Sequence, residues 1–110
     1  MRFAVPLADG VLCNHFGHCQ QFAMIEAEGE QVVKKELLTP PPHEPGVIPR
    51  WLQGMGVQVI IAGGMGARAM GMFQEMGIRV VTGAPMLPPE TLVEQYLRRT
   101  LQTGANVCDH

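Results

Sequence analysis

The chain has 110 residues, of which 46% are hydrophobic and 16% charged, a composition typical of one folded domain rather than a disordered segment. Its formal charge is −2 and it contains no basic run, which argues against nucleic acid as a partner. The N-terminus resembles a first strand rather than a signal peptide, and no apolar stretch approaches the roughly 20 residues that span a bilayer. We therefore expect a cytoplasmic protein with no membrane partner, built as a single α/β domain over residues 1–104 and a tail over residues 105–110.

Three β-type runs come first in the chain. They are Arg2 to Ala8, Gln21 to Ala27 and Gln31 to Leu38. Asp9-Gly10 is a turn signal that ends the first run, and Glu28-Gly29-Glu30 is short enough to join the other two in an antiparallel hairpin. The proline-rich stretch TPPPHEPG, residues 39–46, excludes regular structure and predicts a stiff surface connection.

Helices and strands alternate over the rest of the sequence. The pattern predicts a helix over Val47 to Met55, a strand over Val57 to Ala62, a helix from the turn Gly63 to Gly66 as far as about Met76, a strand over Ile78 to Thr82, and a helix from about Pro88 that stops at Gly104. Both strands are almost continuously apolar, which indicates burial on both faces and a parallel βαβ unit. The order β-β-β-α-β-α-β-α predicts a mixed five-stranded sheet covered by helices in a three-layer fold, with functional loops at the carboxyl edge of the strands.

Potential metal ligands gather in CNHFGHC, residues 13–19 and here called the cysteine loop, and in the terminal CDH. Thiolate sulfur and imidazole nitrogen bind zinc, iron, Cu(I) and iron-sulfur centres. In a reducing compartment, clustered thiols favour metal or redox chemistry over a structural disulfide. The predicted ligands are Cys13, His15, His18, Cys19, Cys108 and His110. The alternative is that Cys13 and Cys19 are small buried hydrophobic residues beside a turn, with the histidines solvated.

The tail could extend on the order of 20 Å. If it folds back to the cysteine loop, six donors meet, enough for a tetrahedral site or a multinuclear centre. A frayed terminus is the alternative, because reach does not set direction.

Residues Gly63, Gly64, Met65 and Gly66, here called the glycine turn, join a buried strand to a helix. Exposed amides at a helix N-terminus form an anion site when no side chains block them. The turn lacks the Lys-Ser/Thr ending of a P-loop, and Ala69 stands where G-x-G-x-x-G has its third glycine. A tight strand-to-helix turn without a ligand is therefore the alternative. No carboxylate pair or Ser/Thr triad context stands out, so no catalytic residue is predicted.

These residues carry a resemblance to a known family. NHFG at residues 14–17, Phe22, VIIAGGMGARAM at residues 59–70 and GIRVVTG at residues 77–83 resemble the dinitrogenase iron-molybdenum cofactor biosynthesis family, and the resemblance covers about residues 2–103. That family contains nitrogenase cofactor carriers, a domain of the cofactor-assembly radical enzyme, and the orange protein with its molybdenum-copper sulfide cluster.

The resemblance implies a ribonuclease H-like fold that carries a metal-sulfur cluster and is not itself a catalyst. It places the cluster at His15 and at the glycine turn, Gly63, Gly64, Met65 and Gly66. Cys13, His18-Cys19 and the CDH ending are additions to the family's general pattern, and they favour direct coordination by the protein.

The sequence therefore predicts a carrier or assembly factor in iron-molybdenum cofactor or iron-sulfur biosynthesis, connected with nitrogen fixation. The bound group would be a metal-sulfur cluster, either iron-sulfur or iron/molybdenum-sulfide, or a single zinc or iron ion. Partners would be cluster-assembly or acceptor proteins, and the chain a monomer or small homo-oligomer. Two alternatives are a mononuclear zinc or iron enzyme that activates water and a regulatory module that binds an anion at the glycine turn.

Overall fold

A computed structural model describes residues 1–14, 16, 19–42, 44 and 46–104. Its elements are β1 (Arg2–Ala8), β2 (Val11–Leu12), β3 (Gln21–Glu28), β4 (Gln31–Leu38), α1 (Val47–Gly54), β5 (Val59–Ile61), α2 (Ala67–Glu75), β6 (Arg79–Val81) and α3 (Pro89–Leu97). The predicted α/β class is confirmed, and each predicted strand and helix has a counterpart. Among the described helices, none is long and apolar enough to cross a membrane.

The strands form one mixed sheet in the order β4-β3-β1-β5-β6, with β2 paired to β1. The pairs β4/β3, β3/β1 and β1/β2 are antiparallel, while β1/β5 and β5/β6 are parallel as predicted. The predicted count of five strands was wrong, because the described residues form a six-stranded sheet. Asp9 and Gly10 both have positive φ, which is the conformation of a two-residue hairpin turn, so the chain folds straight back and pairs Ala8 with Val11.

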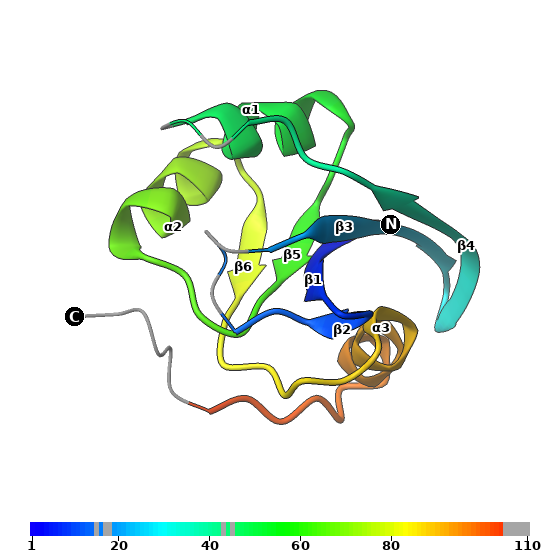
Figure 1. The fold of residues 1–110 in the computed structure, drawn as a ribbon. Coiled ribbons are helices and arrows are strands. Elements are labelled where there is room, and N and C mark those ends of the chain that lie inside the picture. The colour runs from blue at the N-terminus through cyan, green and yellow to red at the C-terminus, as the bar shows by residue number, and fades with distance from the viewer. Residues whose placement is uncertain (15, 17–18, 43, 45, 105–110) are drawn as a thin grey trace.

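Helices cover both faces of the sheet, with α1 and α2 on one side and α3 on the other (Figure 1). Side chains alternate along the central strand: Phe3 and Val5 pack into the cluster that contains Leu92 of α3, whereas Ala4 packs into the cluster that contains Phe73 of α2. Each face therefore has its own apolar core, and the predicted three-layer arrangement is confirmed.

The last helix is shorter than predicted, because α3 ends at Leu97 rather than at Gly104. Arg99 adopts a left-handed conformation with φ 61°, and the amides of Thr100 and Leu101 both donate to the carbonyl of Gln95. A left-handed residue closes a helix in this way because it turns the chain off the helix axis. Leu101, which the prediction placed inside the helix, therefore packs on the core from the segment after the helix.

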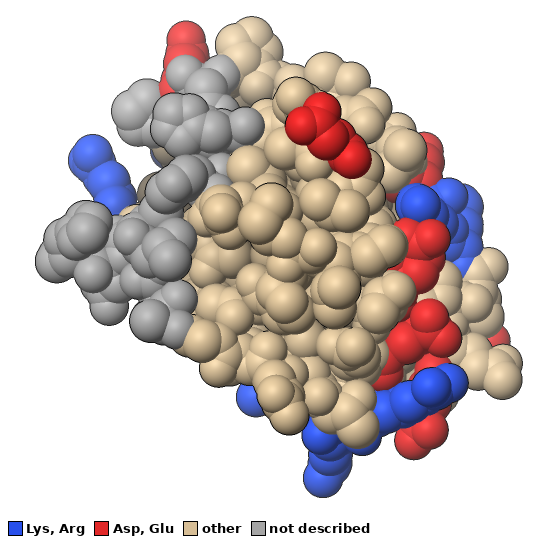
Figure 2. Space-filling model, turned by 60° about the horizontal axis from the view of Figure 1, so that its bottom comes forward, with Lys and Arg blue, Asp and Glu red and all other residues tan. Residues whose placement is uncertain are grey.

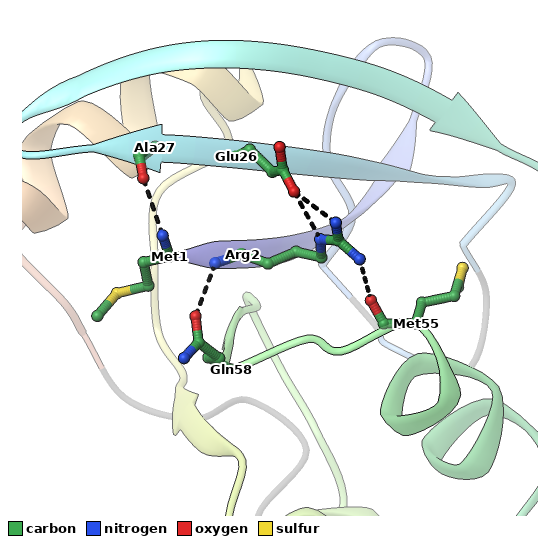
Figure 3. Close-up of polar contacts among 6 residues, drawn as sticks. All are labelled: Met1, Arg2, Glu26, Ala27, Met55 and Gln58. Atoms are coloured by element: carbon green, nitrogen blue, oxygen red, sulfur yellow. Dashed lines mark hydrogen bonds and ion pairs between the residues drawn. The ribbon is translucent and has the colours of Figure 1, made fainter.

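Arg2 connects three parts of the fold at the start of β1 (Figure 3). Its guanidinium donates to the Glu26 carboxylate of β3 and to the carbonyl of Met55 after α1, and its amide donates to Gln58 Oε1 at 3.0 Å. The amino group of Met1 donates to the carbonyl of Ala27 at 2.8 Å. Because the Arg2–Glu26 pair is exposed to solvent, it positions these segments more than it stabilises them.

The Arg2–Glu26 pair makes a prediction for acid unfolding. Arg2 holds the pKa of Glu26 below its ordinary value, first by hydrogen bonding and then by its charge. A carboxylate whose folded pKa is depressed stabilises the fold above its unfolded pKa and loses that contribution as the pH falls through the folded pKa. We expect the free energy of unfolding of Glu26→Gln, measured by urea titration, to fall less than that of wild type between about pH 6 and about pH 3. The control Glu30→Gln, in the hairpin turn, should follow wild type, and an unchanged difference between Glu26→Gln and wild type across this range would refute the prediction.

Candidate functional site

The cysteine loop begins directly after β2 and is held by the last part of β1. The amide of Cys13 donates to the carbonyl of Pro6 at 2.9 Å, and the amide of Gln20 donates to the carbonyl of Leu7 at 2.8 Å. Both ends of the loop therefore meet neighbouring residues of one strand. This brings the two ends of the loop, and with them Cys13 and Cys19, to the last part of β1.

Phe16 is the apolar anchor of the cysteine loop. It is 6% exposed, and its ring packs edge-on against Phe22 of β3 and Phe73 of α2, with centroids 5.8 and 5.7 Å away. Its amide donates to the carbonyl of Gly64 at 2.9 Å. The central phenylalanine of the loop is thus part of the core on the α1/α2 face, which anchors the loop at residue 16.

The two loop thiols lie close enough to influence each other. Cys13 is buried and Cys19 half-buried, with no disulfide between them. Burial, together with the neighbouring Cys13, raises the pKa of the Cys19 thiol to about 11, against a smaller lowering by a backbone hydrogen bond. A desolvated thiol such as that of Cys19 stays protonated at neutral pH unless a cation stabilises its thiolate.

The glycine turn contacts the backbone of the cysteine loop. Gly63, Gly64 and Met65 are buried, and only Gly66 at the start of α2 is exposed. A Cβ on Gly63 would lie 3.1 Å from the carbonyl oxygen of Cys13 and 3.2 Å from the Cα of Asn14. Two backbones therefore come close at this point, and a side chain at residue 63 would require the Cys13–Asn14 backbone to move by a few tenths of an ångström. The buried part of the turn contacts protein, so a ligand would reach the turn at Gly66.

A third segment reaches the same edge of the sheet. The amide of Gly83, which follows β6, donates to the carbonyl of Gly63 at 2.7 Å, and the amide of Gly104 donates to the carbonyl of Gly83, also at 2.7 Å. Sequence reasoning missed this role of Gly83. The available signal was a glycine directly after an apolar strand pattern, a position where backbones can approach closely.

Charged side chains are absent from most of the chain around this edge. Residues 10–14, 80–89 and 100–104 contain no Lys, Arg, Asp or Glu. Figure 2 turns the bottom of the molecule forward and shows a broad uncharged area there, with charged residues gathered mainly along its border. Met86 is 55% exposed. These three segments therefore offer no basic side chain to attract an anion.

Of the six predicted metal ligands, the described residues include Cys13 and Cys19, and the structure brings these two together. His15, His18, Cys108 and His110 lie outside the described residues. Within the described part of the chain, no group of three or more His, Cys, Asp or Glu is arranged to hold a metal ion. The full ligand set therefore stays a prediction, as does anion binding at the glycine turn.

The contact at Gly63 predicts how the site responds to a single methyl group. Gly63→Ala forces the Cys13–Asn14 backbone to move, so we expect a loss of about 1–3 kcal/mol in the free energy of unfolding and of about tenfold or more in Zn²⁺ affinity. Chemical denaturation and competition with a chromophoric chelator measure the two effects.

The matched control for this substitution is Gly66→Ala. Gly66 has φ −68°, and a Cβ there meets nothing within 4 Å. This variant should stay within about 0.5 kcal/mol of wild type in stability and should keep its Zn²⁺ affinity. Equal affinities in the two variants would show that the Gly63 contact does not shape the metal site.

The raised thiol pKa predicts a pH dependence of metal binding. The Cys19 thiol keeps its proton at pH values below about 11, and a metal ion must displace this proton. The metal affinity therefore rises with pH by about tenfold per unit for each proton released. We expect Zn²⁺ binding at neutral pH to release protons, including the one on Cys19, which are counted with a pH indicator in weak buffer. Cys19→Ala should lower this number by about one, and pH-independent affinity would contradict the assignment.

Comparison with known proteins gives consistent results. The model of the family described as "Dinitrogenase iron-molybdenum cofactor" matches residues 1–99. The uncharacterized protein MJ0580 of Methanocaldococcus jannaschii is 32% identical over 85 residues, which cover 73% of this chain and 72% of that protein.

Two solved structures share the whole fold. The crystal structure of PH0822 superposes with a TM-score of 0.88 at 28% identity and covers 96% of each chain. The apo form of the orange protein from Desulfovibrio gigas superposes with a TM-score of 0.76 at 23% identity, covering 96% of this chain and 93% of that one. At that identity, the second likeness shows the fold alone.

Proposed function

Because the chain belongs to the dinitrogenase iron-molybdenum cofactor family, which confirms the resemblance seen in its sequence, we propose that it binds a metal or metal-sulfur cluster at the cysteine loop. It carries this group between proteins of cofactor assembly in the cytoplasm. The observation that carries the proposal is the pair of neighbouring thiols, Cys13 and Cys19, in a loop that Phe16 and the glycine turn hold in place.

The ligands in this proposal are the soft donors of the loop, Cys13, His15, His18 and Cys19. Thiolate and imidazole suit iron, zinc and sulfide clusters and disfavour Mg²⁺ and Ca²⁺. The burial around Cys19 supports the proposal, because desolvated thiols gain most from a cation that replaces their protons. Cys108 and His110 complete the ligand set.

The bound group in this proposal is an iron-sulfur or iron/molybdenum-sulfide cluster, with a single zinc or iron ion as the smaller alternative. The family supports a cofactor-related role, and the orange protein supports a fold of this kind for the carrier. The ribonuclease H-like label belongs to the same proposal, supported by a sheet that joins an antiparallel hairpin to two parallel strands.

Anaerobic purification followed by elemental analysis tests the proposed function. We expect stoichiometric metal, with a brown or orange colour if a sulfide cluster is bound. Cys19→Ala should lose most of the metal, since half-buried Cys19 can be truncated with little loss of packing. Asn14→Ala, an exposed change in the same loop, should keep it.

Each outcome of this experiment discriminates between functions. A colourless protein with stoichiometric zinc would favour a mononuclear ion over a cluster. A wild-type protein with no metal would overturn the proposal in favour of an anion-binding regulatory module. Full metal content in Cys19→Ala would remove the cysteine loop from the site.

A further inference from the structure

We propose that the edge strand β4 binds β4 of a second copy of this chain, antiparallel to it, about a two-fold axis at Lys35. This pairing sets Lys34 of each copy opposite Glu36 of the other, and Val33 opposite Leu37. It joins the two sheets into one continuous sheet. The proposal does not depend on the metal site, because it uses no residue of the cysteine loop or the glycine turn.

The strand β4 is a long, open edge of the sheet. It lies at one end of the strand order and β6 at the other (Figure 1). Within the described part of the chain, β4 pairs with β3 alone, so alternate N–H and C=O groups along its other side point away from the sheet. Proteins commonly protect an edge by keeping it short, which holds for β6 with three residues but not for β4 with eight. A long edge of this kind is the surface to which another strand is added.

Two exposed apolar side chains mark the part of β4 that a partner strand can follow. Val33 is 53% exposed and Leu37 is 48% exposed. The register between β3 and β4 shifts between Glu26 and Ala27, which leaves Val33 without a residue directly opposite it in β3. Because a bulge bends a strand and ends its regular pairing, the segment open to a second strand runs from Val33 to the end of β4.

Three charged residues, Lys34, Lys35 and Glu36, lie between these two apolar positions. Lys34 and Glu36 are on one face of the sheet, where both line the same pocket. Lys35 is on the other face, where its Nζ lies 2.9 Å from Glu90 Oε1 of α3. The charge of Lys35 is therefore compensated within its own chain.

Two-fold symmetry restricts the registers that two β4 strands can adopt. Directly opposite residues in an antiparallel pair alternate between hydrogen-bonded and non-hydrogen-bonded positions. Two pairs that a two-fold axis relates must be of the same kind, so the axis has to pass midway between a residue and its own copy. Within the charged stretch, that residue is Lys34, Lys35 or Glu36.

Charge decides among these three registers, because opposite charges and apolar side chains attract across a strand pair whereas like charges repel. An axis at Lys34 sets two Lys34 side chains against each other and Val33 against a lysine. An axis at Glu36 sets two carboxylates against each other. The axis at Lys35 instead gives two Lys34–Glu36 pairs and two Val33–Leu37 pairs. The two lysines that meet on this axis are those whose charge α3 compensates.

Reversing one charge at a time tests this pairing, with sedimentation equilibrium as the measurement. We expect a reversible wild-type dimer with a dissociation constant on the order of 100 µM, typical of a small interface. Lys34→Glu sets two pairs of glutamates across the axis and Glu36→Lys two pairs of lysines, so each should weaken self-association about tenfold.

Mixing these two variants in equal amounts should restore association to about the wild-type level. In the mixed pair, every glutamate at positions 34 and 36 of one copy faces a lysine of the other. A variant that associates poorly because its fold is damaged would not recover in this way. The double variant Lys34→Glu/Glu36→Lys, which keeps the wild-type net charge, should also recover its self-association.

The matched control is Glu30→Lys, which makes the same change of charge as Glu36→Lys at an exposed residue of the hairpin turn. It lies outside the paired segment and should keep the wild-type dissociation constant. Equal weakening by Glu30→Lys and Glu36→Lys would assign the effect to net charge and refute the pairing.

Two further results would overturn the proposal. One is a wild-type protein that stays monomeric at about 1 mM, and the other is a mixture that associates no better than its two components. If the variants fail to fold, amide hydrogen exchange of the wild type decides. Exchange of alternate β4 amides that slows as the protein concentration rises supports the pairing, and exchange that is independent of concentration refutes it.

Discussion

The close approach of Gly63 to the backbone of Cys13 and Asn14 is the constraint on which the arrangement of this site depends. The parallel strands β1, β5 and β6 end at one edge of the sheet, and a chain segment follows each of them. These segments can stack only where side chains are missing, as they are at Gly63 and Gly83. Main-chain hydrogen bonds then fix the stack, so the position of the thiols is set by backbone geometry, with Phe16 as the side chain that ties the loop to the core.

The secondary structure could be predicted because its signals are local. The buried strand β5 and the amphipathic helix α3 are visible in the spacing of apolar residues. The errors arose where pairing or packing with another part of the chain decides the structure. Asp9-Gly10 marks a turn, but only the pairing of Ala8 with Val11 shows that a strand follows it. Apolar residues at helical spacing continue to Leu101 although the helix stops at Leu97, because Leu101 reaches the same core from outside the helix.

The candidate site could be predicted in chemistry but only partly in geometry. The residue types of CNHFGHC indicate soft-metal binding without any structure. The sequence could not show that Cys13 is buried beside Cys19, because this depends on hydrogen bonds from the loop to Pro6 and Leu7 of β1. Gly83 gave the weakest signal. Its importance appears only when residue 104, twenty-one positions later, is found in contact with it.

The burial of the loop thiols also has a consequence for their chemical reactivity. A thiol attacks peroxide or another electrophile as its thiolate, and with a pKa of about 11 the thiolate fraction of Cys19 at pH 7 is on the order of 10⁻⁴. The Cys19 thiol is therefore a poor nucleophile at this pH. Oxidants that react with an exposed, ionised cysteine find little thiolate at Cys19, so the desolvation of this side chain protects its sulfur atom from oxidation.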